Sequence, residues 1–219
     1  MGAVIMFSFF PSKKKSLYSK LVKAFPAEFA SDVEIICNAL TLTSDAHLTV
    51  ESYACNRRLY SEAATTWRLP SGETIAIPYR IYISDRLLFS GKLTPRQTLV
   101  YHCIFSRSYD GYIRQKHIEA LLDLDPPVWA MPYIIKICDE YIKEILEIVY
   151  HKLKDTDCTP YKTLCALNFD YVRQGHARMI SYWSEYYRYE CYRYHEYIGK
   201  KLYGECFGYR KTGQQSISF

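Results

Sequence analysis

Tyrosine and arginine side chains, which suit recognition better than catalysis, are concentrated near the carboxyl end of the chain. Residues 182–209 contain nine of the 22 tyrosines, and Arg188 and Arg193 stand among them. A tyrosine combines a large apolar ring with a hydroxyl group that needs a hydrogen-bond partner, so it suits half-buried and interface positions. Guanidinium groups beside such rings can contact a protein or stack on nucleic-acid bases. We therefore expect an adhesive surface in this segment.

Three interpretations of the tyrosine-rich segment remain open: core packing, a protein-binding face, and a nucleic-acid-binding face. Four glutamates within residues 185–205 weaken the positive field, and no RNA- or DNA-binding motif is recognisable, so protein binding is favoured over nucleic acid. Core packing and protein binding can both hold, because tyrosines fall on every side of a predicted helix. The predicted partner-binding residues are Tyr186, Tyr187, Arg188, Tyr192, Arg193, Tyr194 and Tyr197.

Cysteine and histidine pairs could supply a metal site or a nucleophile. Cys191 and His195 lie four residues apart on a predicted helix, so both could reach one ion. Zinc needs three or four ligands, and no second pair has comparable spacing, so we predict a packed thiol beside a partly exposed imidazole and no metal. His102 and Cys103 are neighbours in sequence and point about 100° apart on a helix, so they cannot form a dyad with each other.

Clustered carboxylates give no clear catalytic signature. Glu140, Glu144 and Glu147 could line one face of a helix, but Lys136 and Lys143 share that stripe. Alternating charges at three- and four-residue spacing are typical of a solvated, ion-paired surface, which is our prediction here.

Known catalytic sequence motifs are absent, because the chain has no hydrolase elbow, zinc-protease, phosphate-loop or dinucleotide-binding pattern. An enzyme is therefore the less favoured class, and we assign no catalytic residue and no cofactor. If the protein is an enzyme with dispersed residues, His47, His102 and His176 are the candidate general bases. A pocket that brings one of them beside a cysteine or carboxylate would favour that hypothesis.

The first half of the chain predicts two helices and one hairpin. Apolar residues at helical spacing predict a helix over residues 27–42, and Asp45 as an N-cap predicts a second one to about residue 64. Alternating residues on either side of Pro-Ser-Gly predict a hairpin of residues 65–69 and 74–77. Residues 79–83 could extend it, although Pro78 interrupts the ladder.

The second half is predicted to be helical. Thr94, Pro95 and Gln97 have the spacing of a capping box, so a helix should begin there and end near residue 107. Further helices are expected over residues 112–122 and 159–167.

A central helix over residues 132–154 is apolar on most of its circumference, which predicts packing on several sides. After a break at residues 168–175, the tyrosine-rich segment should form a last long helix to about Tyr197 or Tyr203. The predicted fold is mainly α, a compact multi-helix domain around the 132–154 helix with one small hairpin near residues 65–83.

Domain organisation and compartment follow from composition. We expect a flexible extension at residues 1–15, one helical domain at 16–205 and a flexible tail at 206–219. The apolar first residues are too few to span a bilayer and lack the features of a secretory signal, so we expect a cytosolic protein whose eight cysteines are free. The net charge of +5 leaves protein, RNA and anionic membranes as possible partners.

The function predicted from the sequence is a non-enzymatic cytosolic protein-interaction module. An immunity-type protein that neutralises a toxin, or a component of bacterial defence that recruits a partner, is the specific form that we expect. The segments SRSYDGYIRQKHIEALL and ISYWSEYYR have the character of bacterial proteins without an assigned activity, which adds no functional residues. Binding of RNA or single-stranded nucleic acid through the tyrosine-rich helix is the first alternative, and an enzyme is the second.

Overall fold

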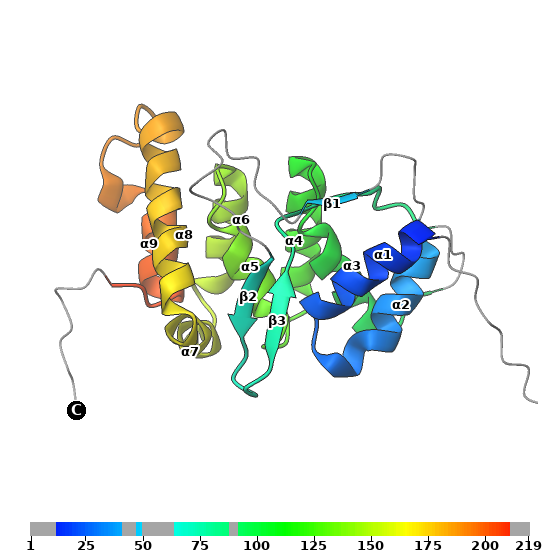
Figure 1. Cartoon of the computed structure of the whole chain (residues 1–219). Helices are drawn as coiled ribbons and strands as arrows, with labels where there is room; N and C mark the ends of the chain where they lie inside the picture. Colours follow the sequence, from blue (N-terminus) through cyan, green and yellow to red (C-terminus); the bar gives the residue numbers. More distant parts are fainter. Residues whose placement is uncertain (1–11, 41–46, 50–63, 88–91, 211–219) are drawn as a thin grey trace, which may run out of the picture.

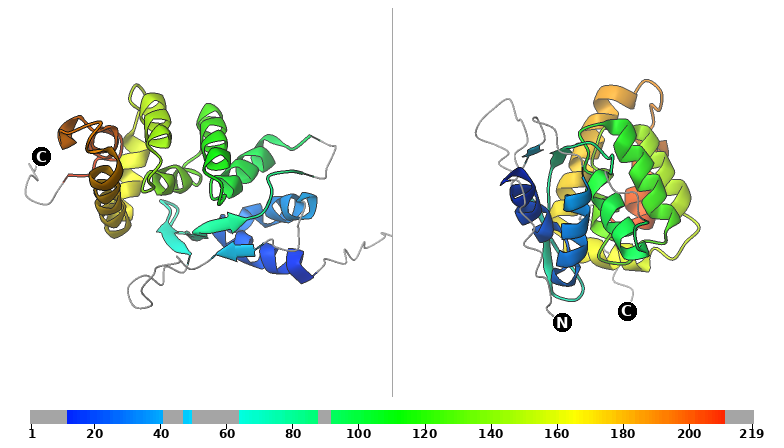
Figure 2. Two further views of the ribbon diagram at one scale, coloured as in Figure 1. Left: turned by 90° about the horizontal axis from the view of Figure 1, so that it is seen from above. Right: turned by 90° about the vertical axis from the view of Figure 1, so that its right-hand side faces the viewer.

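The computed structural model describes residues 12–40, 47–49, 64–87 and 92–210 (Figure 1). Within these ranges the chain is mainly α-helical with a small β-hairpin, as predicted. The helices follow one another across the molecule roughly in sequence order, from α1 and α2 to α8 and α9. Seen from above, the amino-terminal helices and the strands lie on one side of the helices α4 to α6 (Figure 2).

The amino-terminal unit contains α1 (Ser12–Leu21), two 3-10 turns (Val22–Ala24 and Ala27–Phe29) and α2 (Ala30–Ala39). The predicted 27–42 helix therefore starts with a 3-10 turn and ends at Ala39. Most of the helix predicted from Asp45 to about residue 64 lies outside the described residues. Where that segment is described, at β1 (His47–Thr49), it is a strand, so the helix prediction is wrong there.

The predicted hairpin is confirmed, with β2 (Thr65–Arg68) and β3 (Thr74–Ile77) paired antiparallel. Trp67 lies opposite Ile75, and both side chains are buried. Gly72 closes the turn with φ of 89°, a conformation in which other residues are strained.

The predicted extension of the hairpin at residues 79–83 is wrong, because β4 (Arg80–Tyr82) pairs with β1 instead. Pro78 has no backbone N–H to donate to the ladder, so the hairpin ends at β3. The backbone of Ile81 instead exchanges hydrogen bonds with the loop after α3: its N–H donates to the carbonyl of Arg107 at 2.8 Å, and its carbonyl accepts from Tyr109 at 2.9 Å. This connection holds β4 beside the loop that precedes α4.

Both helices of the next pair begin where capping residues predict. Thr94 caps α3 (Pro95–Phe105) through the full capping box: its Oγ1 accepts from Gln97 N at 3.2 Å, and its own N–H donates to Gln97 Oε1 at 3.1 Å. Asp110 caps α4 (Gly111–Asp123), which packs on α3. Local hydrogen-bonding chemistry thus sets both helix starts.

The predicted central helix is two helices, α5 (Met131–Ile137) and α6 (Lys143–Leu153), joined by a non-helical linker. Every residue of α5 is buried, which confirms the central apolar packing for this part. The predicted solvated stripe is wrong at Lys136 and Glu140, whose side chains are buried. The linker contains Asp139 and Glu140, and each carboxylate is drawn inward to cationic partners from other elements.

The carboxy-terminal part begins with α7 (Thr159–Leu167), as predicted, followed at once by α8 (Phe169–Tyr182). The predicted break at residues 168–175 is therefore wrong except at Asn168. The side chain of Asn168 pairs with the backbone of Arg68 through two hydrogen bonds of 2.8 and 2.9 Å, so it fastens the α7–α8 junction to the hairpin.

The predicted last long helix is also wrong, because α8 ends at Tyr182. A π-helical turn (Trp183–Tyr187), a 3-10 turn (Tyr194–Glu196), α9 (Ile198–Lys201) and a second π-helical turn (Leu202–Cys206) follow. The chain folds back because Trp183 Nε1 donates to the carbonyl of Cys191 at 2.9 Å. Cys206 and Phe207, predicted to begin a tail, are buried.

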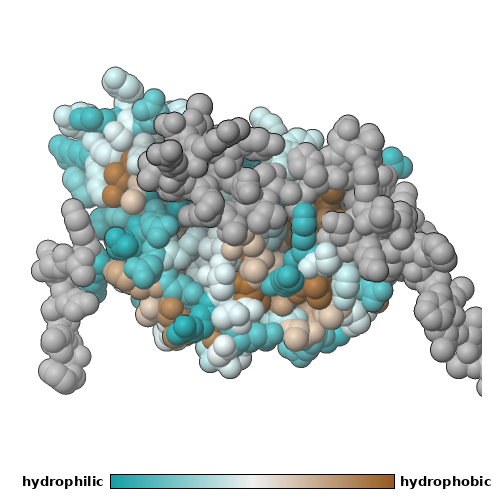
Figure 3. Space-filling view, in the orientation of Figure 1, coloured by the Kyte–Doolittle hydropathy of each residue, from teal (hydrophilic) through white to brown (hydrophobic). Residues whose placement is uncertain are grey.

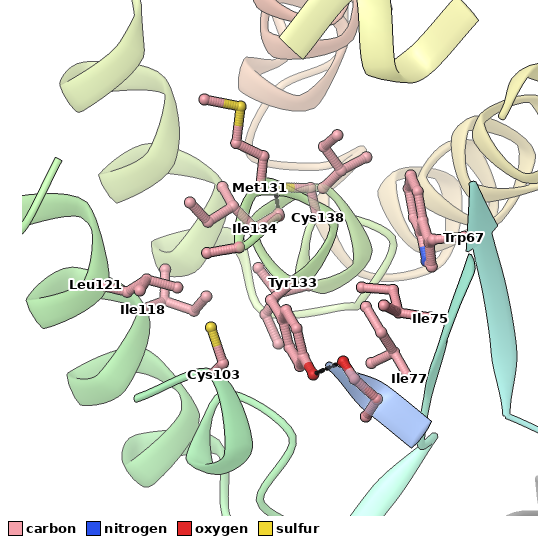
Figure 4. Packing of buried hydrophobic residues seen from close by; sticks show 14 of the residues in the cluster. Trp67, Ile75, Ile77, Cys103, Ile118, Leu121, Met131, Tyr133, Ile134 and Cys138 are labelled. Atoms are coloured by element: carbon pink, nitrogen blue, oxygen red, sulfur yellow. Dashed lines mark hydrogen bonds between the residues drawn. The ribbon is translucent and has the colours of Figure 1, made fainter. Parts of the chain in front are cut away.

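The hydrophobic core joins the hairpin to the helices around α5 (Figure 4). Ile75 and Ile77 point toward Tyr133 of α5, and Trp67 lies beside Ile75. The hydroxyl of Tyr133 donates to the carbonyl of Ala24 at 2.6 Å. On the face shown in Figure 3, residues of high hydropathy form small groups separated by hydrophilic ones. Most of the large apolar side chains of the described residues lie in the buried core, where their burial stabilises the fold.

Candidate functional site

The predicted partner-binding residues do not share one face. Tyr186 and Tyr192 are 58% and 75% exposed, and Arg188 and Arg193 are also exposed. Tyr187 and Tyr194 are half-buried, and Tyr197 is buried. The tyrosine-rich segment therefore both fills the interior and contributes rings to the surface, so the core and binding interpretations divide between individual residues.

The inward tyrosines form a packed aromatic group. Tyr197 stacks beneath Tyr187 with ring centroids 6.1 Å apart. Tyr194 shares a hydrogen bond of 3.0 Å with His176 Nε2, and burial raises the pKa of Tyr194 to about 12. His176, a predicted general base, is buried against the ring of Tyr209 at 4.4 Å. These contacts indicate that His176 packs in the interior of the protein.

A cleft of about 650 Å³ lies between the start of α4, the α5–α6 linker and the first π-helical turn. Its lining residues are Asp110, Gly111, Tyr112, Gln115, Tyr141, Ile142, Glu144 and Tyr187. Of the seven partner-binding residues predicted from the sequence, only Tyr187 lines the cleft. The sequence did not indicate Tyr112 and Tyr141, because both are distant in sequence from the tyrosine-rich segment.

Exposed rings line and flank the cleft. Tyr112 is 87% exposed and Tyr141 is 50% exposed. The ring of Tyr141 lies 6.1 Å from that of Tyr182 and 6.4 Å from that of Tyr186, so the aromatic surface continues from the cleft onto the end of α8. We call Tyr112, Tyr141, Tyr182, Tyr186 and Tyr187 the tyrosine rim.

Two close contacts fix the shape of the cleft. A Cβ on Gly111 would lie 2.9 Å from Ile142 Cδ1, so α4 approaches the linker as closely as it does because this position has no side chain. The hydroxyl of Tyr187 donates to the carbonyl of Tyr141 at 2.5 Å and accepts from Lys143 N at 3.3 Å. Tyr187 thereby fastens the π-helical turn to the linker.

The cleft lining is acidic, although the whole chain is basic. Asp110 and Glu144 supply two carboxylates, and no lysine or arginine stands among the lining residues. At both helix starts beside the cleft a first-turn N–H is already bonded: Asp110 Oδ1 accepts from Tyr112 N at 2.8 Å, and the hydroxyl of Tyr187 accepts from Lys143 N at 3.3 Å. Since these first-turn N–H groups are occupied, neither helix offers them to an anion.

A buried cluster of three arginines around Glu140 lies next to the cleft. Arg80 Nη1 and Arg107 Nη1 lie 2.7 and 3.0 Å from Glu140 Oε1, and Arg114 Nε lies 2.9 Å from Oε2. Arg114 also donates to the carbonyls of residues 108 and 109 at 2.9 Å. A desolvated carboxylate needs such partners, which explains why Glu140 leaves the predicted solvent stripe. The cluster holds the linker against the loop before α4.

Two other histidines form a hydrogen-bonded chain with a carboxylate. His102 Nδ1 lies 2.9 Å from His117 Nδ1, and His117 Nε2 lies 3.4 Å from Asp85 Oδ2. Burial lowers the pKa of His117 to about 4 and also lowers that of His102, so both rings are neutral at pH 7. His102 thus reaches a carboxylate only through His117, and neither ring lines the cleft. The side chain of His47 lies outside the described residues.

Cys191 and His195, the pair weighed as metal ligands in the sequence, are not joined by further ligands among the described residues. Cys191 lies in a non-helical stretch, where its Sγ contacts the carbonyl of Arg193 at 3.6 Å, and His195 is exposed. Within the described ranges, no three His, Cys, Asp or Glu side chains are grouped so that they could hold a metal ion. The seven cysteines in those ranges are not in disulfides.

Comparisons with known proteins identify no relative. No protein-family model matches the chain, and no curated protein or solved structure is significantly similar to it. Among the helices described here, none has both the length and the apolar character needed to cross a membrane.

Proposed function

We propose that this protein is a non-enzymatic interaction module that binds a short segment of a partner protein in the cleft and on the tyrosine rim. The supporting observation is that tyrosines from three parts of the chain that are distant in sequence meet at one cleft, where Tyr112 and Tyr141 are exposed and Tyr187 is half-buried. Tyrosine is enriched at protein interfaces because it gives a large contact area for little loss of side-chain entropy.

The dimensions of the cleft favour a segment over a flat surface. A volume of about 650 Å³ lies within the usual range for pockets that hold a small ligand or a few side chains. The partner would insert these side chains, while Tyr182 and Tyr186 would contact the chain on either side. A role in bacterial immunity or defence, in the cytosol, is the specific form of this proposal and rests on the sequence.

Nucleic acid is the less favoured ligand of this site. The carboxylates of Asp110 and Glu144 would repel phosphates, and the N–H groups of Tyr112 and Lys143 are already bonded within the protein. An enzyme is less favoured as well, because no histidine or cysteine lines the cleft.

Capture of a partner by the full chain tests the proposal. The partner is first identified by co-purification from the native host, and its affinity is then measured for Tyr112→Ala, Tyr141→Ala and Tyr192→Ala. We expect each of the first two to weaken binding about tenfold or more, as interface hot spots do. Tyr192, which is 75% exposed and stands outside the cleft lining, is the matched control and should have little effect.

Two results would contradict the proposal. If Tyr192→Ala weakens binding while both cleft variants bind normally, the interface lies at the exposed end of the segment, as the sequence alone predicts. If the bound material is nucleic acid, with an affinity that falls steeply with salt, the class of partner is wrong. Thermal unfolding of each variant separates lost binding from lost folding.

A further inference from the structure

The chemistry of the cleft indicates which side chain of a partner it receives, provided that the proposed function is correct. Two carboxylates and an amide from Gln115 surround exposed tyrosine rings, without a cation among the lining residues. Aromatic faces with nearby carboxylates attract cations, because the ring quadrupole and the negative charges act together.

Both carboxylates retain capacity for a ligand. Asp110 uses Oδ1 to cap α4, and within the described residues no hydrogen bond reaches its Oδ2. Glu144 is exposed and has no ion-pair partner in the described part of the chain. An incoming donor would therefore not have to displace a cation from either group.

The charged residues around the cleft do not cancel this preference. Lys143 stands beside Glu144, but its Nζ lies 3.1 Å from Glu190 and 3.7 Å from Glu147. The guanidinium of Arg114, near the floor, is paired with Glu140. Arg114 shares Glu140 with the buried Arg80 and Arg107, so the nearest cations are each held in an ion pair, and the lining itself carries two carboxylates.

We propose that the cleft binds an arginine side chain of the partner's segment. The guanidinium would lie against the rings of Tyr112 and Tyr141 and donate to the carboxylates of Asp110 and Glu144. Arginine fits better than lysine because its planar group stacks on aromatic faces and offers a fork of donors to carboxylates on two walls.

Binding of two small peptides to the full chain tests this assignment. The probes are acetyl-Gly-Arg-Gly-amide and the same peptide with citrulline, which is neutral and of nearly equal shape. Ring signals of Tyr112 and Tyr141 are followed by NMR, with assignments from Tyr→Phe variants. We expect the arginine peptide to bind with a Kd on the order of millimolar, as befits one side-chain group, and the citrulline peptide to bind at least about fivefold more weakly.

Charge-neutralising variants identify the carboxylates that act. Asp110→Asn keeps a side chain that caps helices well, and Glu144→Gln changes an exposed residue, so both should fold. Each should weaken the arginine peptide about two- to fivefold, as is typical of an exposed ion pair. Glu147→Gln, on the same helix but outside the lining, should leave the Kd unchanged.

Equal binding of the two peptides, or no response of the two rings to the arginine peptide, would overturn the inference. The proposed function can fail separately. If the natural partner is lost with Tyr141→Ala but binds normally to the Asp110→Asn, Glu144→Gln double variant, the module stands and the arginine preference is wrong.

Discussion

Acid should destabilise this fold through His117, a neutral histidine that the fold keeps out of water. Its side chain is 1% exposed and contacts His102 Nδ1 and Asp85 Oδ2. The nearby ammonium of Lys116, which pairs with Asp85, adds further positive charge. Burial and the neighbouring histidine lower the pKa of His117 from 6.5 to about 4. Protonation is therefore disfavoured in the folded state and unopposed in the unfolded state.

The sign and size of the effect follow from this difference in pKa. Between pH 6.5 and 4 the unfolded chain binds the proton and the folded chain does not, so stability falls as the pH falls through this window. The linkage relation gives a loss of about 2 kcal/mol at pH 5 and about 3.4 kcal/mol well below pH 4. The pKa of Asp85 is lowered from 3.8, so its contribution is lost only at lower pH and does not obscure the window.

Urea unfolding at pH 7.5, 6 and 5 measures this prediction. His117→Gln should lower the free energy of unfolding at pH 7.5, because a buried contact is altered, but should reduce its dependence on pH between 7.5 and 5. The lowered pKa of His102 leaves part of that dependence in place. His195→Gln changes an exposed histidine and should leave both quantities unchanged. If wild type and His117→Gln lose stability equally over this range, His117 is not the group that titrates and the explanation is wrong.

Three further substitutions test the structure around the cleft. Glu140→Gln should lower the free energy of unfolding in urea by about 3 to 5 kcal/mol, because it removes the carboxylate that three buried arginines share. The control Glu147→Gln changes a half-buried residue of a surface ion pair and should cost less than about 1 kcal/mol. Tyr187→Phe removes the hydroxyl that holds the α5–α6 linker and should cost about 1 to 2 kcal/mol in the same assay. Gly199→Ala places a Cβ 2.7 Å from Met179 Sδ and should lower the thermal midpoint by several degrees, equivalent to about 1 to 3 kcal/mol of overpacking. An unchanged midpoint would show that Met179 can move aside.

Local chemistry was enough to predict the elements whose ends are fixed locally. The capping box at Thr94, the hairpin around Gly72 and the helix that follows Cys158 all depend on residues within a few positions of one another. Their hydrogen bonds are determined by the side chains of that stretch, so a single sequence carries the signal.

The errors came from contacts between distant residues. Lys136 and Glu140 have the spacing of an exposed stripe, but the partners of Glu140 lie on β4, in the loop after α3, and on α4. The same spacing suits a solvated face or a buried network, and only the tertiary structure distinguishes them. The prediction of a last long helix fails for a more local reason. The side chain of Trp183 donates a hydrogen bond to the carbonyl of Cys191, and the chain turns back there.

The cleft could not be predicted from tyrosine density alone. Tyr112 and Tyr141 stand in stretches of ordinary composition, and they meet Tyr187 because α4 and the linker converge on the π-helical turn. Local composition identified one wall of the site, and the fold supplied the others.

The buried ion cluster gives a physical reason why this cleft can be rigid before a partner arrives. Glu140 precedes Tyr141 in the chain, and Arg114 ties it to the loop that carries Asp110, so both walls are held by one network. A site ordered in advance loses less conformational entropy on binding, which increases affinity without further contacts. Burying three arginines costs free energy of folding. The same charges fix the distance between the rings and the carboxylates of the cleft, which favours binding of a partner.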